Sequence, residues 1–168
     1  MSTKNLSIAS IYIAFGIIIP LCTHYLAAGN IILPMHIPII IAGFTLKPKY
    51  AIIVGFTTPI LSFLITGMPI FFPMLPIMVA ELTTYTIAGW YFKQKMRVNI
   101  YLSLILTMIV GRTIAAIIAQ ILIMGFNAPF ESGIAFISAA ITTGIIGIVI
   151  QILIIPPITK LIYTKLLT

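Results

Sequence analysis

Charged residues are scarce in this sequence. Asp, Glu, Lys and Arg together make up 7% of the 168 residues, whereas a soluble domain carries about 25%. Hydrophobic residues account for 61% of the chain, which is more apolar surface than a water-soluble core can hide. These two proportions exclude a soluble domain and predict an integral membrane protein.

Cysteine and acidic residues are almost absent. Cys22 is the only cysteine, which excludes a disulfide framework and a cysteine metal site, and two histidines are too few to suggest a metal centre. The two acidic residues, Glu81 and Glu131, lie far apart in the chain and supply no carboxylate pair for acid–base chemistry. Motifs of hydrolases, metalloproteases and nucleotide-binding proteins are also missing. We therefore expect neither an enzyme nor a cofactor in this chain, and another protein must power any transport in which it takes part.

The nine basic residues follow a pattern along the chain. Eight of them form four clusters separated by apolar blocks: Lys4; Lys47 and Lys49; Lys93, Lys95 and Arg97; Lys160 and Lys165. Because loops rich in Lys and Arg stay on the cytoplasmic side, the pattern predicts six crossings with both termini cytoplasmic. The net charge is +7, but the charges form no contiguous patch. This spread argues against nucleic acid and for anionic lipid headgroups as partners.

The apolar blocks predict an all-α integral membrane protein with six transmembrane helices in a single domain, residues 1–168. The expected helices cover residues 6–23, 36–46, 50–66, 74–92, 100–126 and 134–163. The second helix is short, because a crossing needs about 20 residues. Either residues 31–35 extend this helix, or the outer loop at 24–35 dips into the membrane.

Two charged residues, Glu81 and Arg112, lie inside the apolar blocks. Placing a charge in the bilayer costs at least about 2.5–3.5 kcal/mol, so such residues usually face a cavity or each other. The fourth and fifth helices place them at depths that a long arginine side chain can bridge. Two interpretations stay open: an ion pair that pins the helices without touching a ligand, or a polar wall of a substrate pocket.

Further polar residues are candidates for the same pocket, which we expect to open to the outside. Tyr85 follows Glu81 by four positions and so lies on the same helix face. The candidate substrate-binding residues are His36, Thr58, Ser62, Glu81, Tyr85, Arg112, Gln120 and Asn127. Each hydroxyl can instead bond to its own helix, Gln120 can instead join two helices, and His36 can instead cap one. Aromatic residues that can stack on a ligand are Tyr25, Phe71, Phe72, Phe126 and Phe130.

The first helix carries a pair of small residues four positions apart, Ser10 and Ala14, with Gly16 nearby. Small residues let two helices approach closely. The pattern alone predicts a docking face for another helix, which belongs either to this chain or to a partner subunit.

Several segments give the chain a resemblance to a known family. They are Leu33-Pro34-Met35-His36-Ile37-Pro38, Ala42-Gly43-Phe44, Lys47-Pro48-Lys49-Tyr50, Val54-Gly55-Phe56, Leu61-Ser62-Phe63, Thr66-Gly67-Met68-Pro69, and Glu81-Leu82 with Tyr85. With the size, the six helices and the small face of the first helix, the chain resembles the S component of an energy-coupling factor (ECF) vitamin transporter. The family's usual first helix has alanine at both small positions, so Ser10 is a mild departure.

The resemblance implies a function. An S component lies in the bacterial cytoplasmic membrane and captures a scarce water-soluble vitamin from outside, in a pocket under the loop between the first two helices. Its small face, here Ser10 and Ala14, meets a membrane scaffold (T) subunit, and two cytoplasmic ATPase subunits use ATP to drive that scaffold. The S component is thought to topple in the membrane to deliver its ligand.

The substrate and one rival function stay open. Arg112 suits a carboxylate, as in niacin or pantothenate, if Glu81 does not neutralise it. Glu81 and Tyr85 suit a neutral heterocycle with N–H donors, such as a hydroxymethylpyrimidine or a deazapurine. The rival is a ligand-free membrane scaffold or assembly protein of the cell envelope, which predicts no pocket and a closed Glu81–Arg112 pair.

Overall fold

A computed structural model describes residues 3–25 and 34–166 of the chain, and every regular element in this part is a helix. Its elements are α1 (Thr3–Tyr25), α3 (His36–Thr45), α4 (Pro48–Thr66), α5 (Met74–Gly89), the π-helical turn η1 (Trp90–Lys95), α6 (Ile100–Phe126) and α7 (Gly133–Leu166). Within these residues six α-helices lie at the expected places, which confirms the all-α prediction, and the crossing of a membrane by all six stays a prediction. The fourth helix starts at its expected residue, and its last part widens into a π-helical turn that continues to Lys95.

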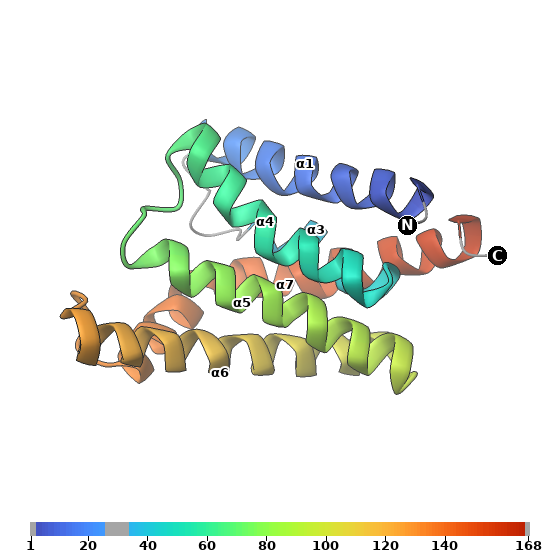
Figure 1. Cartoon of the computed structure of the whole chain (residues 1–168). Coiled ribbons are helices and arrows are strands. Elements are labelled where there is room, and N and C mark those ends of the chain that lie inside the picture. The colour runs from blue at the N-terminus through green and yellow to red at the C-terminus, as the bar shows by residue number, and fades with distance from the viewer. Residues whose placement is uncertain (1–2, 26–33, 167–168) are drawn as a thin grey trace.

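The helices run alternately up and down in one bundle (Figure 1). Helix α5 packs against both α4 and α6, α1 packs on α4, and the short α3 contacts α1, α4, α5 and α7. The start of α1 and the end of α7 lie at the same end of the bundle (Figure 1). The chain therefore returns to the end from which it set out.

The turns between the helices have local causes. Gly67 ends α4 in the left-handed conformation, with φ 74°, and its N–H bonds to the carbonyl of Phe63 at 2.8 Å. A glycine adopts this conformation without the steric cost that a side chain adds. Asn127 ends α6 in the same region, with φ 51°, which asparagine tolerates better than most residues. At the start of α6 the side chain of Asn99 accepts a hydrogen bond from the N–H of Tyr101, at 3.0 Å.

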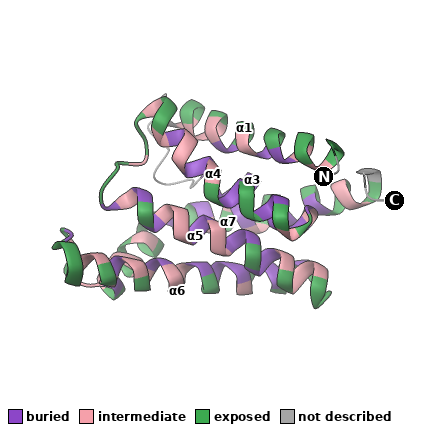
Figure 2. Cartoon of the chain, in the orientation of Figure 1, coloured by how far each residue is buried: buried purple, intermediate pink, exposed green. Residues whose placement is uncertain are grey.

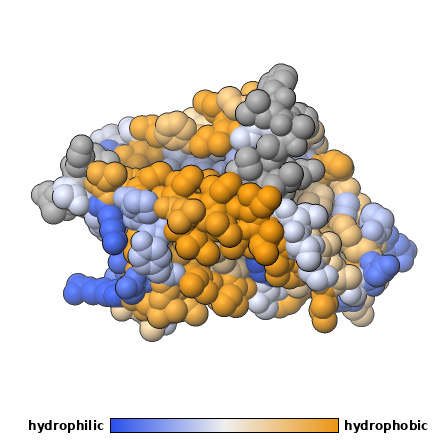
Figure 3. Space-filling model, turned by 180° about the vertical axis from the view of Figure 1, so that it is seen from behind, coloured by the Kyte–Doolittle hydropathy of each residue, from blue (hydrophilic) through white to orange (hydrophobic). Residues whose placement is uncertain are grey.

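The centre of the bundle is formed by α3, most of whose residues are buried. Figure 2 shows buried residues on the inward faces of α4, α5 and α6 and exposed residues on their outward faces. The outer surface of the bundle is nevertheless apolar, because more than thirty large hydrophobic side chains are exposed along its helices. Figure 3, which shows the bundle from behind, has a broad hydrophobic surface between the two ends. An exposed apolar surface of this extent needs a bilayer around it.

Four helices of the described part are long and apolar enough to cross a membrane, over Thr3–Thr23, Pro48–Thr66, Ile100–Phe126 and Gly133–Thr164. Helix α3 has ten residues and rises about 15 Å, half of a hydrocarbon core of about 30 Å. Pro34 and Met35 form a turn and do not extend α3. The rest of the suggested extension, at 31–33, lies outside the described residues.

Two side chains stabilise the last turn of α3. Both lie at the end of the bundle where α1 starts and α7 ends. The side-chain amide of Gln94, in η1, donates to the carbonyls of Gly43, Phe44 and Leu46 at 3.1, 2.9 and 2.7 Å. The hydroxyl of Tyr163 in α7 also donates to the carbonyl of Phe44. These bonds satisfy carbonyls that the end of a helix otherwise leaves without partners, so α3 is fixed at this end.

Candidate functional site

Four polar side chains from three helices meet in the interior of the bundle. His36 is the first residue of α3, Glu81 and Tyr85 lie on α5, and Arg112 lies on α6. Glu81 is 3% exposed and His36 is 4% exposed, while Tyr85 is fully buried. We call these four residues the polar cluster. All four were predicted from the sequence as candidate site residues.

The contacts of the polar cluster converge on a single carboxylate oxygen. Oε1 of Glu81 accepts a hydrogen bond from the hydroxyl of Tyr85 at 2.7 Å and forms an ion pair with Nη1 of Arg112 at 3.0 Å. Nε2 of His36 lies 3.7 Å from the same oxygen, beyond hydrogen-bond distance. The rings of His36 and Tyr85 pack against each other with centroids 5.5 Å apart.

Local sequence explains how the polar cluster forms. Glu81 and Tyr85 are four residues apart on α5, so their side chains lie one above the other. Gly111 precedes Arg112 on α6, and a side chain at this position would collide with the ring of Tyr85. Gly43 of α3 similarly lies against the backbone of Thr86, where an added Cβ would come within 2.9 Å. The missing side chains let α3 and α6 approach α5 closely enough for the polar groups to meet.

The polar cluster retains hydrogen-bonding capacity on one side. Nδ1 and Nε2 of His36 and Nε of Arg112 are buried and have no hydrogen-bond partner among the described residues. A buried polar group without a partner costs about 1–3 kcal/mol. The ion pair is therefore surrounded by groups that the described part of the chain leaves unsatisfied.

The other four candidates lie on α4 and α6, and no hydrogen bond joins them to the polar cluster. The buried hydroxyl of Thr58 donates to the carbonyl of Val54 at 2.6 Å, as expected for a hydroxyl bonded to its own helix, and Ser62 is buried one turn further along. Oε1 of Gln120 accepts the N–H of Gly133 at 2.9 Å and so ties α6 to the start of α7. Asn127 is exposed at the end of α6.

The predicted docking residues of α1, Ser10 and Ala14, are both exposed. The hydroxyl of Ser10 donates to the carbonyl of Leu6 at 3.1 Å. Ile11 and Phe15 lie beside them and are 52% and 50% exposed. The opposite face of α1, which includes Gly16, packs against Thr58 of α4. Within the described residues, the small face is therefore not used for packing inside the chain.

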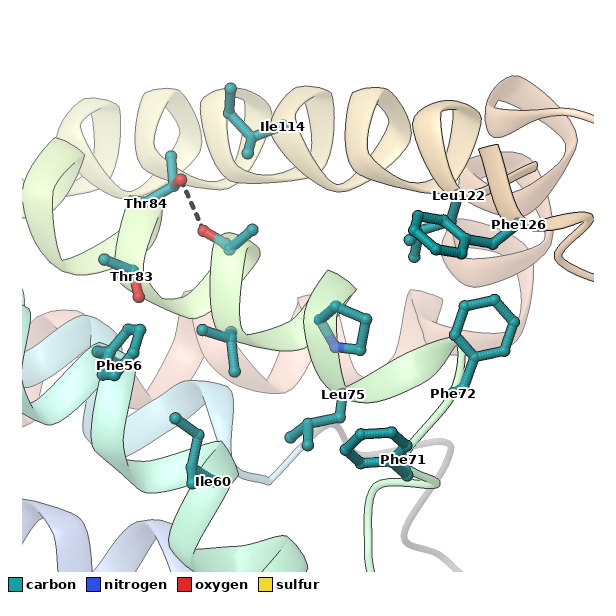
Figure 4. Close-up of a pocket in the computed structure, with 13 residues that line it drawn as sticks. Phe56, Ile60, Phe71, Phe72, Leu75, Thr83, Thr84, Ile114, Leu122 and Phe126 are labelled. Carbon is teal, nitrogen blue, oxygen red and sulfur yellow. Dashed lines mark hydrogen bonds between the residues drawn. The ribbon is translucent and has the colours of Figure 1, made fainter. Parts of the chain in front are cut away.

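A separate groove of about 740 Å³ lies between α4, α5, α6 and the turn before α5. Its side chains are shown in Figure 4, where Phe71, Phe72 and Phe126 gather at one end and Thr83 lies near Phe56 at the other. Ala80, Thr83 and Thr84 of α5 line it, and they point away from the face that carries Glu81 and Tyr85. The sequence did not predict this groove, because its apolar lining looks like any membrane-facing surface.

Parts of the sequence predictions fall outside the described residues. Most of the outer loop expected at 24–35 is among them, because residues 26–33 are not described. The side chains of Tyr25 and Lys165 also lie outside the described part. Gln94 is a structural residue that sequence reasoning missed. Local sequence does not mark it, because the carbonyls that it bonds to lie 48 to 51 positions earlier in the chain.

Comparisons with known proteins place the chain in a family. The family model described as ECF transporter, substrate-specific component, matches residues 4–159, which is nearly the whole chain. Comparison with curated proteins and with solved structures gave no match. The matched family is one of transporter components and not of enzymes, in agreement with the sequence prediction. The chain therefore belongs to the family of substrate-specific components of ECF transporters.

Proposed function

We propose that this protein is the substrate-binding subunit for ATP-driven uptake of a water-soluble vitamin or vitamin precursor across the bacterial cytoplasmic membrane. The ligand is held in a pocket that opens to the outside and whose inner wall is the polar cluster. The observation that carries the proposal is the polar cluster itself, with its unsatisfied groups on His36 and Arg112. Family membership supports a substrate-binding role.

The energetics favour a binding site over a closed structural pair. A pair whose only task is to pin helices is most stable when every polar group is satisfied, because unpaired polar groups in a low-dielectric interior are costly. Here three nitrogen atoms remain buried without partners in the described part. A polar ligand that bonds to them recovers this cost on binding. The Glu81–Arg112 pair is closed at 3.0 Å, as the ligand-free scaffold hypothesis expects, so the three unsatisfied nitrogen atoms are what favours the binding proposal.

We propose six crossings with both termini in the cytoplasm, in which α3 alone covers about half of the second crossing. The start of α1 and the end of α7 lie at one end of the bundle, and Figure 3 shows strongly hydrophilic residues at that end. The basic residues near this end contact aromatic rings, with Nζ of Lys95 5.3 Å from the ring centroid of Tyr91 and Nζ of Lys160 5.6 Å from that of Tyr101. Aromatic and basic residues together are typical of a membrane–water interface on the cytoplasmic side.

The energy comes from partners in this proposal. The chain carries no nucleotide-binding motif, so a membrane scaffold (T) subunit and two cytoplasmic ATPase subunits supply the ATP-driven step. The scaffold docks on the exposed small face of α1, at Ser10 and Ala14. Small exposed residues on a membrane helix support this assignment, because they allow the backbone of a second helix to approach closely and to pack well against the first.

The binding role is tested by a thermal-shift screen of the purified protein against water-soluble vitamins and their precursors. We expect at least one compound to raise the unfolding temperature of the wild type and to have a much smaller effect on Arg112→Gln. Arg97→Gln is the matched control, because Arg97 is an exposed arginine in the turn after η1 and its replacement should leave the shift intact. Equal shifts in both variants would contradict a site at the polar cluster.

A further inference from the structure

The unsatisfied groups of the polar cluster are mainly hydrogen-bond donors. Arginine carries donors and no acceptor, and a neutral histidine carries one donor and one acceptor. Nε of Arg112 and both ring nitrogens of His36 are the buried atoms without partners in the described part. A ligand that satisfies them must therefore offer acceptor atoms, at least one of them to Nε of Arg112.

One oxygen of the Glu81 carboxylate is already occupied. Oε1 accepts from Tyr85 at 2.7 Å and from Arg112 at 3.0 Å, and Nε2 of His36 lies 3.7 Å from it. A ligand N–H donor therefore has to displace one of these contacts or bind the second oxygen, Oε2. The polar cluster offers the hydroxymethylpyrimidine and deazapurine class this one acceptor, whereas three buried nitrogen atoms lack partners in the described part.

The shape of the guanidinium group further restricts the class of ligand that can bind. Glu81 contacts Nη1, whereas Nε lies on the other edge of the planar group, which it shares with Nη2. An arginine edge with two parallel N–H groups matches the two oxygens of a carboxylate. Glu81 thus holds Arg112 in place from one side and leaves the other edge for a second carboxylate.

Charge limits the ligand to one negative group. Glu81 already neutralises Arg112 at 3.0 Å, so the unpaired Arg112 on which the sequence based a carboxylate ligand is not present. A buried unbalanced charge is strongly unfavourable, so the polar cluster can balance one carboxylate at most, and only with a positive charge on His36.

We propose that the ligand is a monocarboxylate whose carboxylate group binds to the Nε edge of Arg112 and to the ring of His36. This inference rests on the proposed binding function and specifies its substrate class. In it, Glu81 is a positioning residue that orients Arg112, and Tyr85 in turn orients Glu81.

The test compares acids with neutral counterparts that differ at the carboxylate. Nicotinate is paired with nicotinamide, pantothenate with pantothenol, and biotin with biotinamide, and hydroxymethylpyrimidine and riboflavin serve as neutral vitamins of other shapes. Dissociation constants are measured by calorimetry with the full chain in lipid nanodiscs. We expect one acid to bind at least about tenfold more tightly than its neutral counterpart. Arg112→Gln should remove this preference, and Arg97→Gln should retain it.

The outcomes separate the substrate class from the function. A neutral compound that binds as tightly as any acid, or an acid preference that survives in Arg112→Gln, would overturn the monocarboxylate proposal and leave the binding function intact. If no compound of either kind binds to the wild type, both proposals fail. The comparison within the wild type does not depend on a variant that folds, and His36→Gln gives a second variant, in which the acid preference should also fall.

Discussion

Glu81 and Arg112 form one ion pair, but replacing each of them should lower the stability of the protein by a different amount. Glu81→Gln leaves the guanidinium group of Arg112 charged, because arginine does not lose its proton in proteins, and this group is mostly buried, with 12% of its side chain exposed. Breaking a buried pair in this way costs about 3–5 kcal/mol. Arg112→Gln is less damaging, because the carboxyl group of Glu81 can take up a proton and keep its 2.7 Å contact with Tyr85.

The double variant isolates the interaction itself. Glu81→Gln combined with Arg112→Gln leaves two neutral amides at the same place, so its loss of stability should be smaller than the sum of the single losses. Residues in direct contact show coupling energies of about 0.5–3 kcal/mol, and the 3.0 Å contact places this pair in that range. Unfolding is followed by the fluorescence of Trp90, the only tryptophan in the chain. Additive losses, or a larger loss for Arg112→Gln than for Glu81→Gln, would refute the reasoning.

Three further changes test other parts of the structure. Tyr85→Phe removes the hydroxyl that bonds to Glu81 at 2.7 Å and should lower the free energy of unfolding by about 1.5–3 kcal/mol, whereas Tyr101→Phe, at an exposed tyrosine, should have little effect; equal losses would contradict the assigned bond. Ala14→Trp should block uptake in cells that contain the complete transporter and spare binding to the isolated subunit; unchanged uptake would remove the docking face. A reporter fused after Lys95 should be cytoplasmic and one inserted near Asn127 external, and the reverse pattern would overturn the topology.

Much of the helical layout was readable from the sequence. Apolar blocks separated by basic clusters gave bounds close to those of α4, α6 and α7, because length and hydropathy decide where a membrane helix can form. The π-helical turn that follows α5 from Trp90 was not predicted, and its Gln94 bonds to carbonyls at the end of α3. Such contacts between distant segments leave no mark in local composition.

The residues of the polar cluster could be predicted from the sequence, but their arrangement in space could not. Glu81 and Arg112 stood out because charges are rare in apolar blocks, and Tyr85 followed from its spacing on the helix. Nothing in the sequence showed that His36 would lie 3.7 Å from Glu81, because the position of α3 depends on close packing at Gly43. For Gln120, the bond to Gly133 depends on how the turn after α6 folds back.

The central claim is that the polar cluster binds a small molecule, and mass spectrometry tests it most directly. The protein is purified gently, denatured, and the small molecules released from it are identified and quantified. The account predicts a vitamin or vitamin precursor in stoichiometric amount from the wild type, and a large loss of that molecule from Arg112→Gln but not from Arg97→Gln. An empty wild-type protein that no vitamin stabilises in the thermal-shift screen would contradict the account and favour a ligand-free scaffold.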